Sequence, residues 1–336
     1  MRLFSALFML VTAVAGWLVV GELFGRSPLL QLAGASVVAL QPMTTFVSSG
    51  VNPDAAFDAS IGLVLWLCVR TLVRGLSWRR AAALLALMMA AALVKGTTLL
   101  FLPAVAFALL FGIWRRRREA GRATTARGVA LVLAGCAALG GLVLVVSRGG
   151  SGQVDHWIPQ SFAELREFGS YLINFYLPVR PPFIRDFPVL RTFPLYSVWI
   201  KTSWGAFGWL ETRFPDSVYP LFALISAATF GGALYAAWRR VVAIPWAVVA
   251  FFVLMLIPLA LGLHWLEYRE LVTLKYGIRI QGRYLLPLMP IAGVAVAAAL
   301  SLLRERWRPV AAGLVVGGMA ALQLVSLGLV AGRFYA

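Results

Sequence analysis

The sequence predicts an all-α polytopic membrane protein with about ten transmembrane helices and one long outer loop. Hydrophobic residues make up 61% of its 336 positions and charged residues only 13%, whereas a soluble domain is about 45–50% apolar and ~25% charged. The mean hydropathy is +0.86, and the apolar runs reach the roughly 20 residues that a membrane span requires. These observations exclude an ordinary soluble enzyme, a nucleic-acid-binding domain and a disordered chain.

Ten apolar segments are candidates for transmembrane helices. The first is too long for the apolar region of a cleaved signal peptide, and no polar domain follows it, so we expect it to stay in the protein. In chain order the expected spans are 3–24, 28–47, 55–73, 81–94, 97–114, 128–147, 217–238, 241–263, 284–303 and 309–330.

The fourth and fifth spans are short because they share one apolar run. The run extends over 34 residues from Ala81 to Trp114, and a single helix of that length, at about 1.5 Å per residue, would overshoot the bilayer. Lys95-Gly96 interrupts the run. We therefore expect a tight hairpin with Lys95 at its outer tip.

The charges of the short connections predict the orientation. Sixteen basic and three acidic residues lie on one face of the expected topology, a net charge of +13, against +4 on the other face. Short cytoplasmic loops are enriched in Lys and Arg, so the first face is predicted to be cytoplasmic. The protein is then expected in the cytoplasmic membrane, with both termini of the chain outside. The formal charge of +17 reflects this topology and indicates no nucleic-acid partner.

The expected spans divide the chain into three parts. Residues 1–147 form an amino-terminal bundle of six spans, residues 148–216 form the outer loop, and residues 217–336 form a carboxy-terminal bundle of four spans. Structureless loops as long as the middle part are uncommon. We therefore expect the outer loop to contain structure of its own.

A helix is the expected element of the outer loop. Ser161 and Glu164 have the spacing of a capping box, in which the Ser and Glu side chains satisfy the first backbone amides of a helix. The segment that follows, Leu165 to Tyr176, is aromatic on one side. This pattern favours a helix that lies in the plane of the membrane interface.

Cysteines and histidines predict no metal centre. Cys68 and Cys136 lie inside apolar runs, which favours small buried side chains over a disulfide or thiolate ligands. His156 and His264 lie near acidic residues but in no established zinc-binding spacing, and His264 with Glu267 is only a weak zinc signal. No cofactor follows from the sequence, and a divalent cation stays open as an alternative.

Two carboxylates are the candidate catalytic residues. Ten of the 13 acidic residues lie on the expected outer face, so acid–base chemistry is expected there. Asn52-Pro53-Asp54 begins the third span, and Asp58 follows one helical turn later, which places Asp54 and Asp58 on one helix face. Asp58 would lie just inside the membrane, where ionisable groups mark functional or paired sites. Alternatively, Asp54 caps the helix.

Three cations are candidates for binding a phosphate. Arg283 follows Gly282 at the start of the ninth span; its planar guanidinium suits a phosphate, and the glycine would let a ligand approach closely. Arg279 lies just upstream, and Lys95 is the third candidate. The alternative is that these side chains extend to lipid phosphates in general.

Aromatic residues of the outer loop have two interpretations. The segment from Trp199 to Trp209 is rich in Trp, Phe and Gly. It suits either the aromatic belt of a membrane interface or a surface on which a sugar stacks. Trp204 and Trp209, together with Tyr284, are the candidates for either role.

Several short motifs follow one another in a set order. They are Pro42-Met43-Thr44-Thr45-Phe46, Asn52-Pro53-Asp54, Lys95-Gly96, Ser203-Trp204-Gly205-Ala206-Phe207-Gly208-Trp209 and Gln281-Gly282-Arg283-Tyr284-Leu285-Leu286-Pro287. In combination, the NPD, FGW and GRYLLP elements resemble a large family of bacterial multi-pass membrane proteins of unknown function that is grouped with the GT-C glycosyltransferases. The resemblance covers nearly the whole chain.

The resemblance implies a GT-C-like fold and an inverting glycosyltransferase. Such an enzyme moves a sugar from a polyprenyl-phosphate lipid to a cell-envelope glycan acceptor on the outer face, so its partners are these two substrates and the membrane lipids. By position, Asp54 would be an acidic element of the active site, and Lys95 and Arg283 would hold the donor phosphate. A divalent cation could join Asp54 to an acid of the first outer loop.

The chain departs from the family pattern at its amino terminus. Arg2-Leu3-Phe4 resembles the start of the second span of such enzymes, so we expect the first span and the first outer loop, with its catalytic acid, to be missing. Three other functions stay open: a lipid-linked glycan polymerase or ligase, a transporter or flippase, and a non-catalytic truncated homologue. Tolerance of substitution at Asp54 would favour the ligase.

Overall fold

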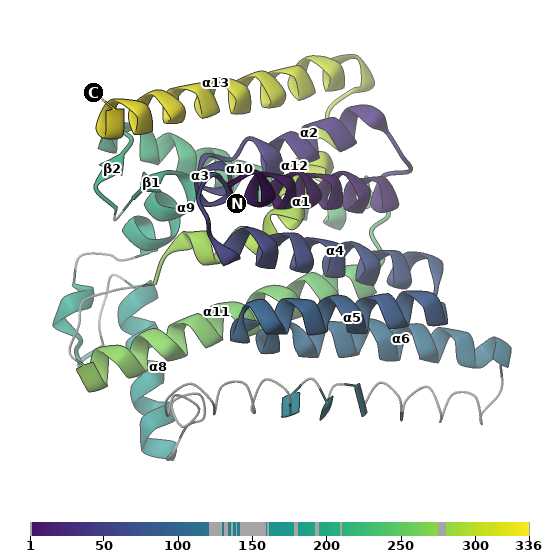
Figure 1. The fold of residues 1–336 in the computed structure, drawn as a ribbon, viewed down its shortest axis with the longest axis horizontal. Coiled ribbons are helices and arrows are strands. Elements are labelled where there is room, and N and C mark those ends of the chain that lie inside the picture. The colour runs from purple at the N-terminus through teal and green to yellow at the C-terminus, as the bar shows by residue number, and fades with distance from the viewer. Residues whose placement is uncertain are drawn as a thin grey trace.

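The computed structural model describes residues 2–120, 161–177, 181–191, 195–208, 210–274 and 280–335, with isolated positions between 130 and 159. The long helices run in a common direction, and both ends of the chain lie toward the same end of the bundle (Figure 1). Seven described helices are long and apolar enough to cross a membrane, and one bent pair would make an eighth. The predicted all-α polytopic fold is confirmed. Most of the sixth expected span, 128–147, lies outside the described residues.

The amino-terminal part is a layer of antiparallel helices. A short 3-10 helix (Gly96–Phe101) leads into its last member. The helices are α1 (Arg2–Leu23), α2 (Pro28–Ala39), α3 (Pro42–Ser49), α4 (Pro53–Arg74), α5 (Trp78–Val94) and α6 (Leu102–Ala120).

The described carboxy-terminal part contains six further helices and, before α10, a segment of short elements. That segment includes a two-residue antiparallel ladder between β1 (Ala206–Phe207) and β2 (Thr212–Arg213), a π-helical turn (Tyr196–Lys201) and 3-10 turns at Pro188–Leu190 and Asp216–Val218. The helices are α8 (Phe162–Tyr176), α9 (Thr202–Trp204), α10 (Tyr219–Trp238), α11 (Trp246–Leu274), α12 (Met289–Ser301) and α13 (Arg308–Tyr335), with 3-10 helices Gly282–Leu288 before α12 and Glu305–Trp307 before α13.

The second expected span is bent, which corrects the prediction of one helix over 28–47. α2 and α3 meet at an angle of 54°. Pro42 starts α3, and proline disfavours a helical conformation in the residue before it. Gln41 is extended and caps α3, because its Oε1 accepts a hydrogen bond of 2.6 Å from the backbone amide of Thr44. Its Nε2 donates to the carbonyl of Ser203, so the bend is fastened to the segment before β1.

The expected hairpin over 81–114 is confirmed. α5 ends at Val94, and Lys95 is extended, with φ −153°. The carbonyl of Lys95 then accepts hydrogen bonds from the backbone amide of Thr98 at 3.1 Å and from its hydroxyl at 2.7 Å. These bonds start the 3-10 helix that returns the chain into α6, and they fix Lys95 at the tip.

α11 is longer than the predicted span over 241–263. It begins at Trp246 and continues to Leu274, and it contains Pro258. Neither Gly nor Pro occurs between Leu263 and Leu274, so nothing in that stretch stops the helix. The extension carries polar side chains that the sequence analysis had placed in a connection.

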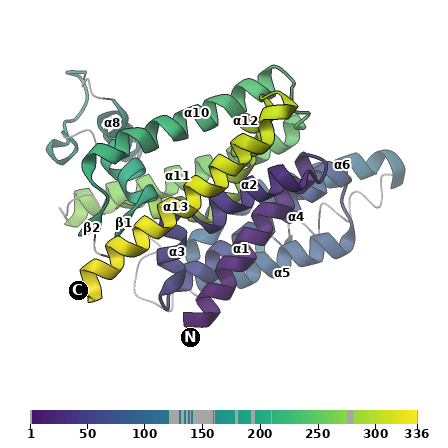
Figure 2. The ribbon, with the colours of Figure 1, turned by 90° about the horizontal axis from the view of Figure 1, so that it is seen from above.

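α8 confirms the helix expected in the outer loop. The hydroxyl of Ser161 accepts a hydrogen bond of 3.2 Å from the backbone amide of Glu164, as a cap should. The helix runs across the direction of the long helices at one end of the bundle (Figure 1), and Figure 2 shows it at the same end. Its Tyr171 and Phe175 are fully buried. α8 therefore covers the extension of α11.

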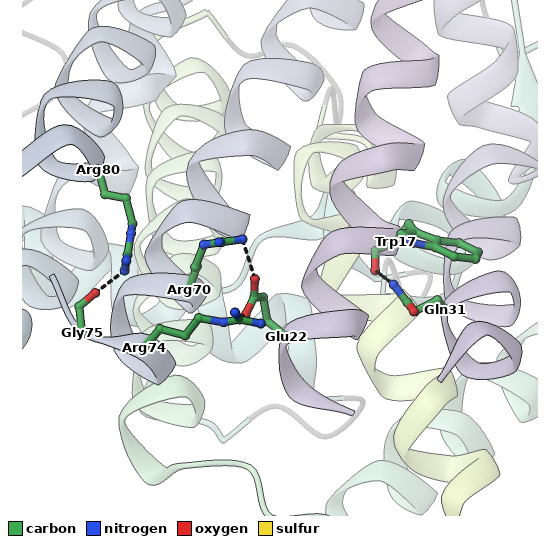
Figure 3. Close-up of polar contacts among 7 residues, drawn as sticks. All are labelled: Trp17, Glu22, Gln31, Arg70, Arg74, Gly75 and Arg80. Atoms are coloured by element: carbon green, nitrogen blue, oxygen red, sulfur yellow. Dashed lines mark hydrogen bonds and ion pairs between the residues drawn. The ribbon is translucent and has the colours of Figure 1, made fainter. Parts of the chain in front are cut away.

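The arginine-bearing connections gather at the opposite end. The turns from α1 to α2, from α4 to α5 and from α12 to α13 all lie there (Figure 1). Glu22, whose side chain is 5% exposed, accepts a 2.9 Å bond from Arg70 and a second from Arg74 (Figure 3). Arg80 donates to the carbonyl of Gly75. We call this the basic end. We call the end covered by α8 the cavity end, because the cavity described in the next subsection opens there.

Candidate functional site

A cavity of about 300 Å³ opens at the cavity end between four elements. Each element supplies polar side chains to it. The polar lining residues are Asp54 and Asp58 of α4, Lys95 and Thr97 of the hairpin tip, Glu267 and Glu270 of α11, and Arg283 and Tyr284 of the 3-10 helix before α12. Five predicted site residues therefore meet in one place, although they come from three separate parts of the sequence.

Asp54 and Lys95 form an ion pair in this cavity. Lys95 Nζ donates to Asp54 Oδ1 over 2.7 Å. Asn52 Oδ1 accepts a 2.9 Å bond from the backbone amide of Asp54 and so caps α4. The ammonium of Lys95 also lies 5.5 Å from the ring of Phe57 and 5.4 Å from that of Tyr284, distances at which a cation is attracted to an aromatic face. The cap role expected of Asp54 is performed by Asn52.

Asp58 lies one turn further into the bundle and is 4% exposed. It lines the cavity beside Asp54, as their spacing predicts. Among the described residues, no hydrogen bond and no ion pair within 4.0 Å reaches its carboxylate. A buried ionisable group without a partner is costly in a membrane protein, so Asp58 is a strong candidate for a functional residue.

Arg283 supplies the cavity with a cation that has no carboxylate partner among the described residues. Its Nε is buried without a hydrogen bond, and its guanidinium carbon lies 5.6 Å from the ring of Tyr284. A guanidinium has five N–H donors in a planar fork. Its donors are therefore available to an anionic ligand in the cavity.

Gly282 has a different role from the one expected. A Cβ there would lie 2.7 Å from the backbone nitrogen of Ser203 and 2.9 Å from the carbonyl oxygen of Trp199. The glycine thus lets the chain pack against the outer segment rather than against a ligand. The hydroxyl of Thr202 accepts a 2.5 Å bond from the amide of Gly282, and these contacts position Arg283.

Glu267 and Glu270 are cavity residues that the sequence analysis did not select. Glu267 entered it only as a weak zinc ligand, because the expected span stopped at Leu263. Glu267 Oε2 accepts a 3.0 Å bond from the backbone amide of Ile280, which steadies the chain three residues before Arg283. Their spacing with Leu263 on one helix face was the signal that would have identified them.

His264 joins α8 to α11 and is not a zinc ligand in this arrangement. Its Nδ1 lies 3.1 Å from the hydroxyl of Tyr171, and its Nε2 lies 2.6 Å from that of Tyr176. Burial raises the pKa of the Tyr171 hydroxyl, so this group stays neutral. Nearby, Arg269 of α11 pairs with Glu164 of α8. α8 is thereby fastened to the part of α11 that lines the cavity.

The remaining predicted residues are not brought into the cavity. Trp204 stacks on Phe222 with ring centroids 4.6 Å apart, and its indole N–H donates to Ser226 over 3.1 Å. Trp209 and Arg279 lie outside the described residues. Within the part of the chain that the structure describes, no three His, Cys, Asp or Glu side chains gather as a metal site.

Two comparisons with known proteins bear on the family of this chain. A search of curated proteins found no match. A family model described as a predicted membrane protein, DUF2142, matches residues 1–292, which include every polar residue of the cavity. The chain belongs to the DUF2142 family of membrane proteins.

Proposed function

We propose that the protein is a GT-C-like glycosyltransferase that moves a sugar from a polyprenyl-phosphate donor to a cell-envelope acceptor. The observation that carries this proposal is that two carboxylates, Asp54 and Asp58, and two cations, Lys95 and Arg283, line one cavity. This cavity lies at the amino-terminal end of α4. Glycosyl transfer from a phosphate needs both kinds of group. A base must take the acceptor proton, and a cation must stabilise the leaving phosphate.

The proposed step follows from the positions of these groups. The acceptor oxygen forms a bond to the anomeric carbon as the bond from that carbon to the phosphate oxygen breaks, and the phosphate leaves with the electron pair. The acceptor proton passes to the carboxylate of Asp54. Arg283 binds the phosphate first, because Lys95 is already paired with Asp54. A phosphate that approaches Lys95 would compete for it and release Asp54 as a base.

The apolar walls of the cavity suit a lipid donor. Leu259, Leu263 and Leu266 of α11 line one side, and Leu286 and Pro287 line another. Apolar surface beside a phosphate-binding cation matches a substrate whose phosphate is attached to a polyprenyl chain. The positive charge of the opposite, basic end supports an orientation in which the cavity faces outward from the cytoplasmic membrane.

The test is complementation of cells that lack the gene, with glycan modification of the envelope as the readout. We expect Asp54→Asn and Arg283→Ala to abolish the modification while the amount of protein in the membrane stays constant. Asp186→Asn is the matched control, because Asp186 is paired with Arg191 on an exposed surface outside the cavity. Wild-type glycan levels in either cavity variant would refute the proposal.

The alternatives predict different outcomes. Full activity of Asp54→Asn with loss of activity in Arg283→Ala would indicate a polymerase or ligase that needs no carboxylate base. Loss of the lipid-linked precursor from the outer face, with transfer intact, would indicate a flippase.

A further inference from the structure

A second cavity lies at the basic end, far along the bundle from the candidate site. Its volume is about 380 Å³. It lies between the last turns of α4, the arginine-bearing part of α6 and the start of α11 (Figure 1). Its principal lining residues are Leu72, Phe111, Trp114, Arg115, Pro245 and Trp246.

The lining combines one cation with an aromatic wall. Phe111 packs edge-on against Trp246, with ring centroids 5.4 Å apart, and contacts Trp114 at 5.5 Å. Trp114 and Trp246 are 51% and 67% exposed, and exposed tryptophans in membrane proteins lie at the level of the lipid headgroups. The cavity is therefore expected at the depth where a headgroup meets its acyl chains.

Arg115 is held in place at this cavity. Its Nη1 donates a 2.7 Å bond to the carbonyl of Leu72, in the last turn of α4. Its Nε and Nη2 make no hydrogen bond within the described residues. One side of the guanidinium is thus fixed by the protein, and the other side keeps two N–H donors in the geometry that matches a phosphate.

The charge around the cavity favours an anion. None of the described lining residues is acidic, unlike those of the candidate site. Three further arginines follow Arg115 directly in the sequence, and Arg239 and Arg240 precede Pro245 by a few residues. Basic pockets between transmembrane helices bind the headgroups of anionic lipids.

We propose that this cavity binds one anionic glycerophospholipid, with its phosphate on Arg115 and the start of its acyl chains against Phe111 and Trp246. The inference concerns a separate site and does not depend on the proposed glycosyltransferase activity. Arg115 provides the charge-assisted bonds, and the aromatic wall provides the apolar contact that a soluble phosphate would not use.

Native mass spectrometry of the full chain in detergent tests this proposal. Phosphatidylglycerol and phosphatidylcholine are titrated separately, and the retained lipid is counted. We expect one tightly retained phosphatidylglycerol, with binding roughly tenfold weaker in Arg115→Gln, a loss of about 1.4 kcal/mol, because the variant removes charge-assisted hydrogen bonds to the phosphate. Trp246→Ala should also weaken it. Glycerol 3-phosphate, which has the headgroup phosphate but no acyl chain, should compete poorly.

Matched controls distinguish a specific lipid-binding site from general electrostatic attraction of anionic lipids to the basic end. Arg304→Gln removes the same charge at the same end, and Trp238→Ala removes an indole that is 76% exposed there; neither residue lines the cavity. Both controls should retain the lipid. Equal losses in Arg304→Gln and Arg115→Gln, equal retention of phosphatidylcholine, or full competition by glycerol 3-phosphate would each overturn the proposal. If Arg115→Gln does not fold, Arg115→Lys keeps the charge without the fork and should still weaken binding.

Discussion

Two buried carboxylates, Glu22 at the basic end and Asp58 at the cavity end, are treated by the fold in opposite ways. Glu22 is 5% exposed at its side chain and receives bonds from two arginines, Arg70 and Arg74. Asp58 is 4% exposed, and no described residue donates to it. Removing a partner from a buried charge is strongly destabilising. A buried carboxylate that has no partner lowers the stability of the fold. A functional role therefore explains the presence of Asp58 better than a structural role does.

The same contrast holds for the arginines of the two ends. At the basic end, Arg70, Arg74 and Arg80 use their donors on Glu22 and on the carbonyl of Gly75 (Figure 3). At the cavity end, Arg283 has a buried Nε that makes no hydrogen bond. The Glu22 cluster of the basic end is satisfied by its own residues, whereas among the described residues Asp58 and the Nε of Arg283 at the cavity end have no hydrogen-bond partner. This difference distinguishes a structural charge cluster from a binding site.

After the losses expected of Asp54→Asn and Arg283→Ala, the largest expected effect is the loss of activity in Asp58→Asn. The variant keeps the shape of the side chain but removes its charge. If Asp58 acts as a base or stabilises charge, transfer should fall by about 10²–10⁴-fold, while the thermal midpoint in detergent stays the same or rises. Quantification of the modified glycan and a melting curve check this together. A lower midpoint with normal transfer would make Asp58 structural, like Glu22.

The next effect is expected from Gly282→Ala. The added methyl group would meet the backbone of Ser203 at 2.7 Å, so the 3-10 helix must shift and carry Arg283 with it. Misplacing a binding group by about 1 Å costs activity up to roughly a hundredfold, and the Michaelis constant for the donor lipid should rise. Gly96→Ala is the control, because a Cβ at Gly96 contacts nothing within 4 Å. Equal kinetics of the two variants would refute this positioning role.

A smaller effect, on stability rather than activity, is expected from Glu22→Gln. It leaves Arg70 and Arg74 without their carboxylate, and because both arginines are partly exposed, we expect a loss of about 2 kcal/mol. Activity per folded molecule should not change. Thermal unfolding in detergent measures the loss, with Glu305→Gln as the control, since the Glu305 side chain is 92% exposed. An unchanged midpoint would show that the cluster contributes nothing to stability.

The smallest effect is expected from Arg333→Ala. Arg333 and Glu211 form an ion pair in which both side chains are more than half exposed, and such pairs contribute about 0–1 kcal/mol. Neither the midpoint nor glycan transfer should change measurably. A clear loss of transfer would extend the functional surface beyond the cavity described above.

Local pattern was enough to predict part of the candidate site. The four-residue spacing of Asp54 and Asp58 predicts a shared helix face because the helix period is 3.6 residues. The Lys95-Gly96 interruption predicts a hairpin tip, since one helix would be too long for the bilayer. The charge count predicts that the arginine-bearing turns share one end of the bundle. The first two features depend only on neighbours in the sequence, and the third depends only on the charges of the short connections.

Other parts depended on contacts between distant segments. The bend between α2 and α3 was missed, although Pro42 signals it, because apolar content alone defined the span. Glu267 and Glu270 were left out because the expected span stopped at Leu263, and the contacts of Tyr171 and Tyr176 with His264, which fasten α8 to the continuation of α11, join segments far apart in the sequence. Trp204 was a candidate for sugar stacking because its segment is rich in aromatic residues, yet its ring stacks on that of Phe222.

The sequence by itself determined that this protein is a helical membrane protein, which of its ends is basic and which residues could be reactive. Hydrophobicity, charge and helical period are properties of single segments, so they can be read before folding. Only the tertiary structure decided that Asp54 is paired with Lys95 and that, among the described residues, the buried Asp58 and the Nε of Arg283 have no hydrogen-bond partner. Those properties depend on which side chains from distant segments come within hydrogen-bonding distance, and packing alone sets those distances.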